Sequence, residues 1–213
     1  GGAIDGDGTG LVVTTEQCLL NPNRNPDLSR DEIEARLAHN LGFERVLWLG
    51  DGLLNDHTDG HVDNLARFVA PGVLAVPRAS GADDPNAAIY ADAAARARAF
   101  GVEVAEVPSP GRIEVEGVVQ PASYMNFVIT TNLVVVPIFG SPHDEAGVAA
   151  IGAGGFGSDR ELERILDDAR EAVEAFSVWG GIPRYWELAA ECPDLRSAVR
   201  ELVLSPLGVL YEE

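Results

Sequence analysis

The sequence predicts an α/β chain, and two observations carry that prediction. Short apolar segments with the spacing of strands alternate with longer segments that have helical spacing, in the order strand, helix and paired strands at least twice over. The composition, 46% hydrophobic and 23% charged over 213 residues, is that of a globular protein. A chain of this length supports one ordinary domain with a small appendage.

The first repeat begins with a turn and a short strand. Residues 5–10 are rich in glycine and aspartate, which predicts a turn, and residues 11–15 are apolar and β-branched, which predicts a strand. Ser29 and Glu32 have the spacing of a capping box, so a helix is expected to begin there and to end at the next glycine. Residues 46–49 form a continuous apolar run, as in a strand that is buried on both faces.

The second repeat has the same order. A hairpin, an alanine-rich helix and a strand are predicted in turn, over residues 65–69 with 73–76, 87–100 and 102–107. A further strand pair is expected within residues 118–139, with its turn near Thr131. These elements assign residues 1–151 to one α/β domain.

A change of pattern follows this domain. Residues 152–157 contain four glycines and predict a linker. Ser158 then begins another capping box, and apolar residues at helical spacing continue beyond it. Residues 158–213 are therefore expected to form a small helical segment.

Composition excludes several classes of function. All 15 basic residues are arginine, so a Walker A loop and Schiff-base chemistry are excluded. The net charge of −19 argues against nucleic acid or an anionic membrane surface as a partner, and no apolar run is long enough for a membrane span. The two cysteines, Cys18 and Cys192, are too few for a disulfide framework and indicate a reducing, cytoplasmic compartment.

The densest polar cluster is the stretch of residues 55–64, which contains His61 and Asp63. In an extended segment these two side chains point to the same side, where an imidazole and a carboxylate together can handle a proton and a cation. His57 lies four residues before His61 and invites a metal interpretation. A metal site needs three or four convergent ligands, so no metal is expected here.

The flanking residues give this pair its context. The sequence resembles the agmatine deiminase family, which is related to the bacterial peptidylarginine deiminases. The resemblance runs colinearly from residue 1 to about residue 150, through the stretches Gly-Gly-Ala-Ile-Asp (1–5), Thr-Thr-Glu-Gln-Cys-Leu-Leu-Asn-Pro-Asn-Arg-Asn-Pro (14–26), Thr-Asp-Gly-His-Val-Asp-Asn-Leu-Ala-Arg-Phe-Val (58–69), Asp-Pro-Asn (84–86), Pro-Ala-Ser-Tyr-Met-Asn-Phe (121–127) and Val-Val-Val-Pro-Ile-Phe-Gly (134–140). It implies a partial pentein fold, an α/β-propeller of ββαβ units.

The resemblance also implies a chemistry, the hydrolysis of a guanidinium to a ureido group with release of ammonia and without a cofactor. In the family a cysteine thiolate attacks the guanidinium carbon while carboxylates hold its N–H groups. The resemblance makes His61 the general acid/base and Asp63 a guanidinium-binding carboxylate. Asp59 is expected to bind substrate as well, and Asn126 either faces the ligand or closes a turn. The expected substrate is agmatine, with peptidyl-arginine as the second choice and a polyamine or arginine-related pathway as the setting.

The sequence departs from the family at the nucleophile. The family's Gly-Gly-x-x-His-Cys motif does not occur here; Cys18 matches a cysteine of the family that is not the nucleophile, and Cys192 lacks the expected neighbours. The expectation is therefore an incomplete amidinohydrolase. The alternative is an inactive fragment that binds guanidines or acts as an interaction module. Exposed strand edges are expected to favour self-association.

The last part of the chain carries a second resemblance. Residues 176–188 and 202–208 are similar to the helical lid region of an archaeal-type AAA ATPase family. Because the chain has no P-loop, this resemblance implies no ATPase activity.

Overall fold

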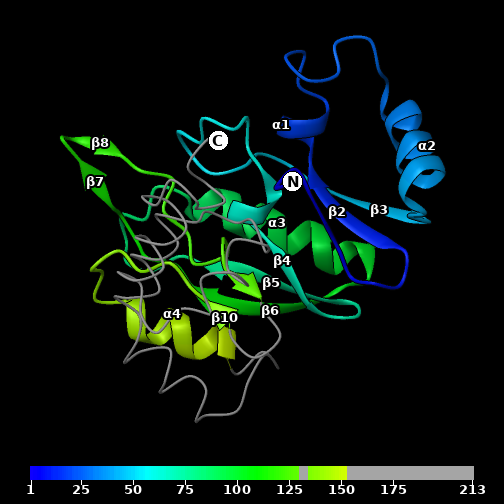
Figure 1. Ribbon diagram of the computed structural model, residues 1–213. Coiled ribbons are helices and arrows are strands. Elements are labelled where there is room, and N and C mark those ends of the chain that lie inside the picture. The colour runs from blue at the N-terminus through cyan, green and yellow to red at the C-terminus, as the bar shows by residue number, and fades with distance from the viewer. Residues whose placement is uncertain (130–133, 153–213) are drawn as a thin grey trace, which may run out of the picture. The chain divides into compact units, whose positions relative to one another are not determined.

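The computed structural model describes residues 1–129 and 134–152 (Figure 1). Residues 1–127 and 136–152 group into one compact unit of mixed α/β structure. The predicted turn near Thr131, most of the predicted linker, the helical segment 158–213 with its ATPase-like stretches, and Cys192 lie outside the described residues. In the described part, no helix is long and apolar enough to cross a membrane.

The first repeat forms a three-stranded sheet with the order β1–β2–β3. Its strands are β1 (Ile4–Gly6), β2 (Leu11–Thr15) and β3 (Arg45–Leu49). β1 pairs antiparallel with β2, and β2 pairs parallel with β3. The predicted turn at residues 5–10 is wrong at its start, because Asp5 and Gly6 belong to β1 and pair with Val13 and Val12.

Two helices connect β2 to β3, namely α1 (Glu16–Leu19) and α2 (Arg30–Leu41). Both halves of the predicted capping box of α2 are present, since Ser29 and Glu32 satisfy each other's backbone N–H groups. Gly42 ends α2 in the left-handed region at φ 75°, which glycine adopts without strain. The helix predicted from these end signals is confirmed.

The second repeat forms a sheet with the order β4–β5–β6. The elements of this repeat are β4 (Arg67–Ala70), β5 (Val73–Arg78), α3 (Ala87–Phe100) and β6 (Glu103–Pro108). β4 and β5 are antiparallel, and β5 and β6 are parallel with α3 as the crossover. The structure thus contains the ββαβ order twice, which confirms the predicted alternation.

A hydrophobic core among the described residues joins the two sheets through α3. Figure 1 shows α3 passing close to both sheets. Its buried face is made largely of alanines, whose small side chains let the helix approach closely, and the core residues are Leu11, Val13, Leu47, Leu49, Leu53, Val62, Leu65, Ala66, Phe68, Leu74, Val76, Tyr90, Ala93, Ala94, Ala97 and Val102. Burial of each large aliphatic member contributes about 1.5–3 kcal/mol before entropy is counted.

The remaining elements are short. β7 (Glu114–Val115) and β8 (Val118–Val119) form a hairpin whose two turn residues both have positive φ. The strand pair predicted within residues 118–139 is therefore wrong at its start, because Val118 pairs with Val115 in this hairpin. β9 (Val128–Ile129) and β10 (Val134–Val135) pair antiparallel, as expected for residues flanking the predicted turn. α4 (Asp144–Ile151) follows.

Candidate functional site

The candidate site lies on the connection between the two sheets. Val62–Asn64 forms a single 3-10 turn (η1), and His61 immediately precedes it. The prediction that His61 and Asp63 share an extended segment is therefore wrong. Val62 and Leu65 are both fully buried, and a helical turn is what brings residues three apart to the same side.

His61 and Asp63 nevertheless share one property that indicates a site. His61 Nε2 and Asp63 Oδ1 are both buried, and neither has a hydrogen-bond partner among the residues that the structure describes. A buried polar atom without a partner costs about 1–3 kcal/mol, so such atoms are rare outside places where a ligand, ion or water completes them. The two atoms therefore have hydrogen-bonding capacity that no described residue uses, and of the two residues only His61 lines the cavity described below.

Burial dominates the electrostatics of Asp63. Desolvation raises the pKa of its carboxyl group, and the positive charges of His61 and Arg67 oppose that rise. The backbone of Asp63 donates to the carbonyl oxygen of Gly2 at 3.1 Å. A Cβ atom on Gly2 would lie 2.1 Å from Asp63 Oδ2, so any other residue at this position would force the Asp63 carboxylate to move. Gly2 belongs to the motif at residues 1–5, but the sequence alone does not indicate its role.

Arg67 fixes the strand that follows η1. Its Nε atom lies 3.0 Å from Asp5 Oδ1, and the other oxygen of Asp5 accepts from the backbone N–H of Phe68 at 2.7 Å. Arg67 also donates to the carbonyl of Phe127 at 3.1 Å. Because Arg67 and Asp5 are largely buried, this pair ties β4 to β1 beside Asp63.

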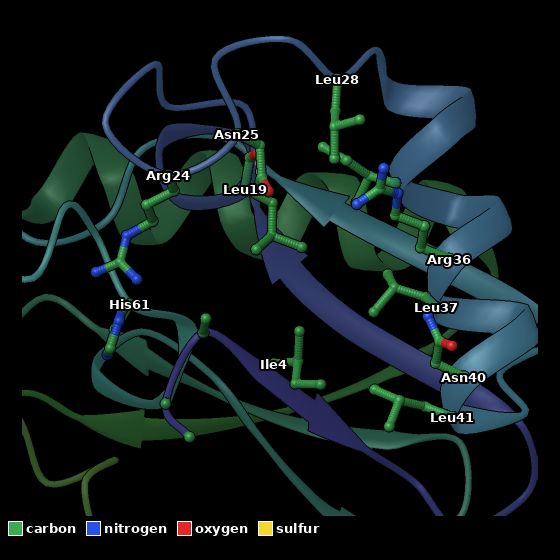
Figure 2. A pocket seen from close by; sticks show the side chains of 14 residues that line it. Ile4, Leu19, Arg24, Asn25, Leu28, Arg36, Leu37, Asn40, Leu41 and His61 are labelled. Atoms are coloured by element: carbon green, nitrogen blue, oxygen red, sulfur yellow. Dashed lines mark hydrogen bonds between the residues drawn. The ribbon is translucent and has the colours of Figure 1, made fainter.

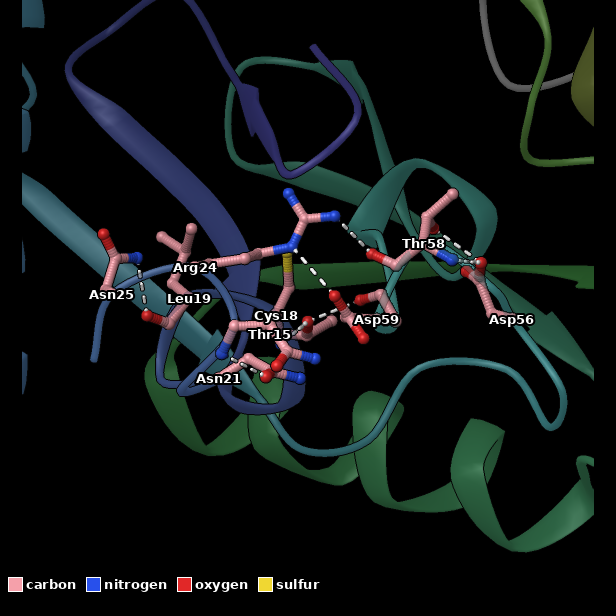
Figure 3. A network of polar contacts seen from close by, with 11 residues as sticks. Thr15, Cys18, Leu19, Asn21, Arg24, Asn25, Asp56, Thr58 and Asp59 are labelled. Carbon is pink, nitrogen blue, oxygen red and sulfur yellow. Dashed lines mark hydrogen bonds and ion pairs between the residues drawn. The ribbon is translucent and has the colours of Figure 1, made fainter.

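Asp59 lies two residues before His61 and forms an ion pair with Arg24. Arg24 Nε is 3.5 Å from Asp59 Oδ2, and Arg24 Nη2 donates to the carbonyl of Thr58 at 2.6 Å (Figure 3). Asp59 has φ 61°, a left-handed conformation that aspartate tolerates better than most residues. Contact between Asp59 and substrate stays a prediction, and it requires Asp59 to share its carboxylate with Arg24 or to give up that pair.

Asn126 is exposed and lies next to η1. Its Nδ2 atom donates to Asn64 Oδ1 at 2.9 Å, and Asn64 in turn donates to Asp56 Oδ2 at 3.1 Å. Burial alone would raise the pKa of Asp56, but hydrogen bonds from Thr58 and Asn64 lower it below the ordinary value. The predicted substrate contact of Asn126 is untested; in the structure this side chain supports the turn that carries Asp63.

An open cavity of about 480 Å³ borders this site (Figure 2). Figure 2 shows His61 and Arg24 at one end of the cavity and Leu37 and Leu41 of α2 toward the other. Its other lining residues include Gly2 and Ile4 from the start of the chain. The cavity gives a small molecule access to His61, along a wall that is mostly apolar.

Cys18 does not have the environment of a nucleophile. Its side chain is fully buried in α1, and it does not line the cavity. Burial raises the pKa of the Cys18 thiol, with the charge of Arg24 opposing the rise. Figure 3 shows Arg24 extending past the Cys18 sulfur toward Asp59. Among the described residues, no group of three or more His, Cys, Asp or Glu side chains is arranged to hold a metal ion.

Comparison with known proteins places this arrangement in a family. Residues 1–165 match the Porphyromonas-type peptidyl-arginine deiminases. The chain belongs to this family. The agmatine deiminase of Stutzerimonas stutzeri is 40% identical over 168 residues, which cover 68% of this chain and 46% of the relative. That of Pseudomonas fluorescens SBW25 is 37% identical over 175 residues, which cover 71% of this chain and 48% of the relative.

Solved structures agree with the family assignment. The agmatine deiminase of Enterococcus faecalis has 36% sequence identity and a TM-score of 0.66, with 72% of this chain and 48% of that chain covered. A cysteine-to-serine variant of C. jejuni agmatine deiminase with substrate bound has 28% identity and a TM-score of 0.68, with 77% and 52% covered. The chain thus spans about half the length of the relatives it matches.

Proposed function

We propose that this chain carries the guanidinium-binding and proton-handling part of an agmatine deiminase-type site. The observation that carries the proposal is the pair of buried, unpartnered atoms, His61 Nε2 and Asp63 Oδ1, at a turn next to an open cavity. A guanidinium offers planar N–H donors to a carboxylate. Its positive charge would favour the ionised form of Asp63, which burial disfavours.

In the proposed reaction Asp63 holds the guanidinium of agmatine and His61 transfers protons. A thiolate adds to the guanidinium carbon, and the departing nitrogen takes a proton from His61 and leaves as ammonia. Water then adds to the thiouronium carbon and passes a proton to His61. The thiolate is expelled, and the ureido product remains. The balance is one guanidinium and one water in, and one ureido group and one ammonium out.

The proposed substrate is agmatine, with peptidyl-arginine as the second choice, in a cytoplasmic polyamine or arginine-related pathway. The family membership and the agmatine deiminases among the relatives support this order. Asp59 and Asn126 are proposed as further substrate contacts. Both lie within hydrogen-bonded networks that adjoin His61 and η1, so a small movement of Arg24 or Asn64 would free them.

A second candidate function is guanidine binding without turnover. The burial of Cys18 favours it, because the cysteine within the described residues has a raised thiol pKa and no access to the cavity. In that case the chain binds guanidines through Asp63, or serves as an interaction module that associates through exposed strand edges. Turnover that depends on a cysteine of this chain would exclude the second candidate.

The experiment measures ammonia and ureido product from agmatine and from an arginine peptide, alongside calorimetric binding of agmatine. Wild type is compared with His61→Ala, Asp63→Asn, Cys18→Ser and Cys192→Ser variants. We expect binding that Asp63→Asn weakens by roughly 10- to 100-fold, as for loss of a charge-assisted bond, and no turnover by the chain alone. Turnover that either Cys→Ser variant abolishes would contradict the second candidate, and binding that is indifferent to Asp63→Asn would contradict both.

A further inference from the structure

The loop that precedes His61 runs from Gly52 to Gly60. Its two ends lie close together, and the close approach of these two glycines is called the neck of the loop. A Cβ atom on Gly52 would lie 2.3 Å from the Cα atom of Gly60. Gly60 also has φ 75°, in the region that favours glycine. His61 is the next residue after this neck, so the position of Gly60 sets where the imidazole begins.

Three side chains from one neighbouring segment hold the loop. The Thr15 hydroxyl donates to the Gly60 carbonyl at 2.6 Å, and Gln17 Oε1 accepts from the Gly52 N–H at 2.7 Å. Arg24 supplies the third contact, with its bond to the carbonyl of Thr58 and its ion pair with Asp59. Thr15 is the last residue of β2, and Gln17 and Arg24 lie between β2 and α2.

The Thr15 contact is the most constrained of the three. Its side chain is fully buried, and the same hydroxyl that donates to Gly60 accepts from the Cys18 N–H at 3.1 Å as the N-cap of α1. The hydroxyl therefore uses its one hydrogen on the loop neck. A rotation of Thr15 would break the helix cap and the neck contact together, which leaves this side chain a single orientation.

We propose that Thr15, Gln17 and Arg24 are positioning residues for His61. The inference rests on the proposed function of His61. His61 Nε2 has no hydrogen-bond partner among the described residues, so that atom does not orient the ring. The backbone at Gly60 and the contacts that hold it then set the direction of the imidazole. Each of the three side chains bonds to main chain at or beside the loop, and none is assigned a reacting atom.

The decisive variant is Thr15→Val, which keeps the shape of the side chain and removes the hydroxyl. Thr15→Ser restores the hydroxyl and serves as the rescue. The matched control is Ser141→Ala, because Ser141 also donates a hydroxyl hydrogen to a backbone carbonyl, that of Pro110, at 2.7 Å. Ser141 accepts from the backbone of His143 at 3.1 Å, so each variant has a different histidine as its neighbour.

The readout is the imidazole ¹H–¹³C NMR spectrum of the folded chain, with assignments from His61→Ala and His143→Ala, followed by calorimetric titration with agmatine. We expect Thr15→Val to shift or broaden the His61 signal, to leave His143 unchanged and to weaken agmatine binding roughly 2- to 10-fold, as for one lost hydrogen bond. Thr15→Ser should restore the His61 signal and the affinity for agmatine. Ser141→Ala should shift the His143 signal and leave the His61 signal and the affinity for agmatine unchanged.

Two further variants test the other contacts. Gln17→Leu and Arg24→Gln are each expected to move the His61 signal in the same way. The proposal is overturned if a folded Thr15→Val variant has the wild-type His61 signal, or if Thr15→Val disturbs all four histidines equally, which would show general loosening. If wild type binds no agmatine, the proposed function fails, while the His61 spectrum still tests the positioning of the ring.

Discussion

The two ββαβ repeats have the same strand order and differ in how their helices pack. In the second repeat α3 buries Tyr90, Ala93, Ala94 and Ala97 against the core that joins both sheets. In the first repeat α2 buries only Ile33, and Leu41 is 57% exposed. Figure 1 shows α2 at the margin of the compact unit and α3 within it.

This difference explains why the cavity belongs to the first repeat. The alanine-rich face of α3 is buried in the core, whereas leucines on α2 line an open space beside β1. The end of β2 and the segment between β2 and α2 also hold the His61 loop. The helix of the second repeat therefore packs into the shared core, and the first repeat supplies the open wall and the support of the candidate site.

The largest effect expected from this contrast concerns the two helices. Tyr90→Ala removes a buried aromatic side chain from α3 and should lower the free energy of unfolding by about 3–5 kcal/mol. Leu41→Ala on α2 should change it by less than about 0.5 kcal/mol, because that side chain is already exposed. Chemical denaturation followed by circular dichroism measures both. Equal losses would show that α2 is packed as tightly as α3.

The residues that precede the two helices differ too. Ser29 caps its own helix, whereas Asn86 makes no cap bond and its Oδ1 atom accepts from the Leu54 N–H at 2.8 Å. Asn86→Ala should therefore cost about 1–3 kcal/mol, because it leaves that N–H without its acceptor. Hydrogen exchange should show faster exchange at Leu54 and not at the start of α3. Faster exchange confined to α3 would contradict this role.

Ser29→Ala is expected to have a smaller effect. Loss of the capping box should cost about 1 kcal/mol and loosen the first turn of α2. The loss should be local, because α2 contributes one buried residue to the fold. Amide exchange measured along the chain tests this: protection should fall over the first turn of α2 while α3 keeps its protection. Loss of protection in both helices would show that α2 is coupled to the core.

The smallest expected effect on stability is at Asp63. Burial raises the pKa of its carboxyl group in the folded chain above the ordinary value of 3.8, so ionisation is easier in the unfolded chain. The ionised carboxyl therefore costs stability once the pH exceeds 3.8, and the full cost is present above the folded-state pKa. Asp63→Asn should slightly raise the melting temperature at neutral pH and lose that advantage below pH 3.8. A neutral-pH destabilisation would show that the carboxylate has a stabilising partner.

Local signals in the sequence predicted most elements within residues 11–108 and missed β1 and α1. The bounds of α3 and the capping box of α2 follow from glycine and serine positions that act within a few residues. The β7–β8 hairpin was missed, because a turn with two positive φ values at Glu116 and Gly117 has no strong signal from glutamate. The pairing of strands that lie far apart in the sequence, such as β2 with β3, was predictable only as far as the repeat order implies it.

The sequence indicated candidate residues for the site but did not indicate their geometry. The motif around His61 and Asp63 identifies the pair, but their extended arrangement was wrong because burial of Val62 and Leu65 imposes a turn. The contacts of Thr15 and Gln17 with the loop span 45 and 35 residues in sequence. No local pattern encodes such contacts. The polar residues of the stretch 14–26 are the one feature of the sequence that could have indicated them.

The most direct test of the central claim is the pH dependence of agmatine binding, measured by calorimetry on wild type and Asp63→Asn. Because the guanidinium binds the ionised carboxyl and burial raises its pKa, the affinity should fall with decreasing pH and begin to fall above 3.8, the ordinary value. Asp63→Asn should bind roughly 10- to 100-fold more weakly at neutral pH and lack this dependence. An affinity in Asp63→Asn equal to that of wild type, with the same pH profile, would contradict the account.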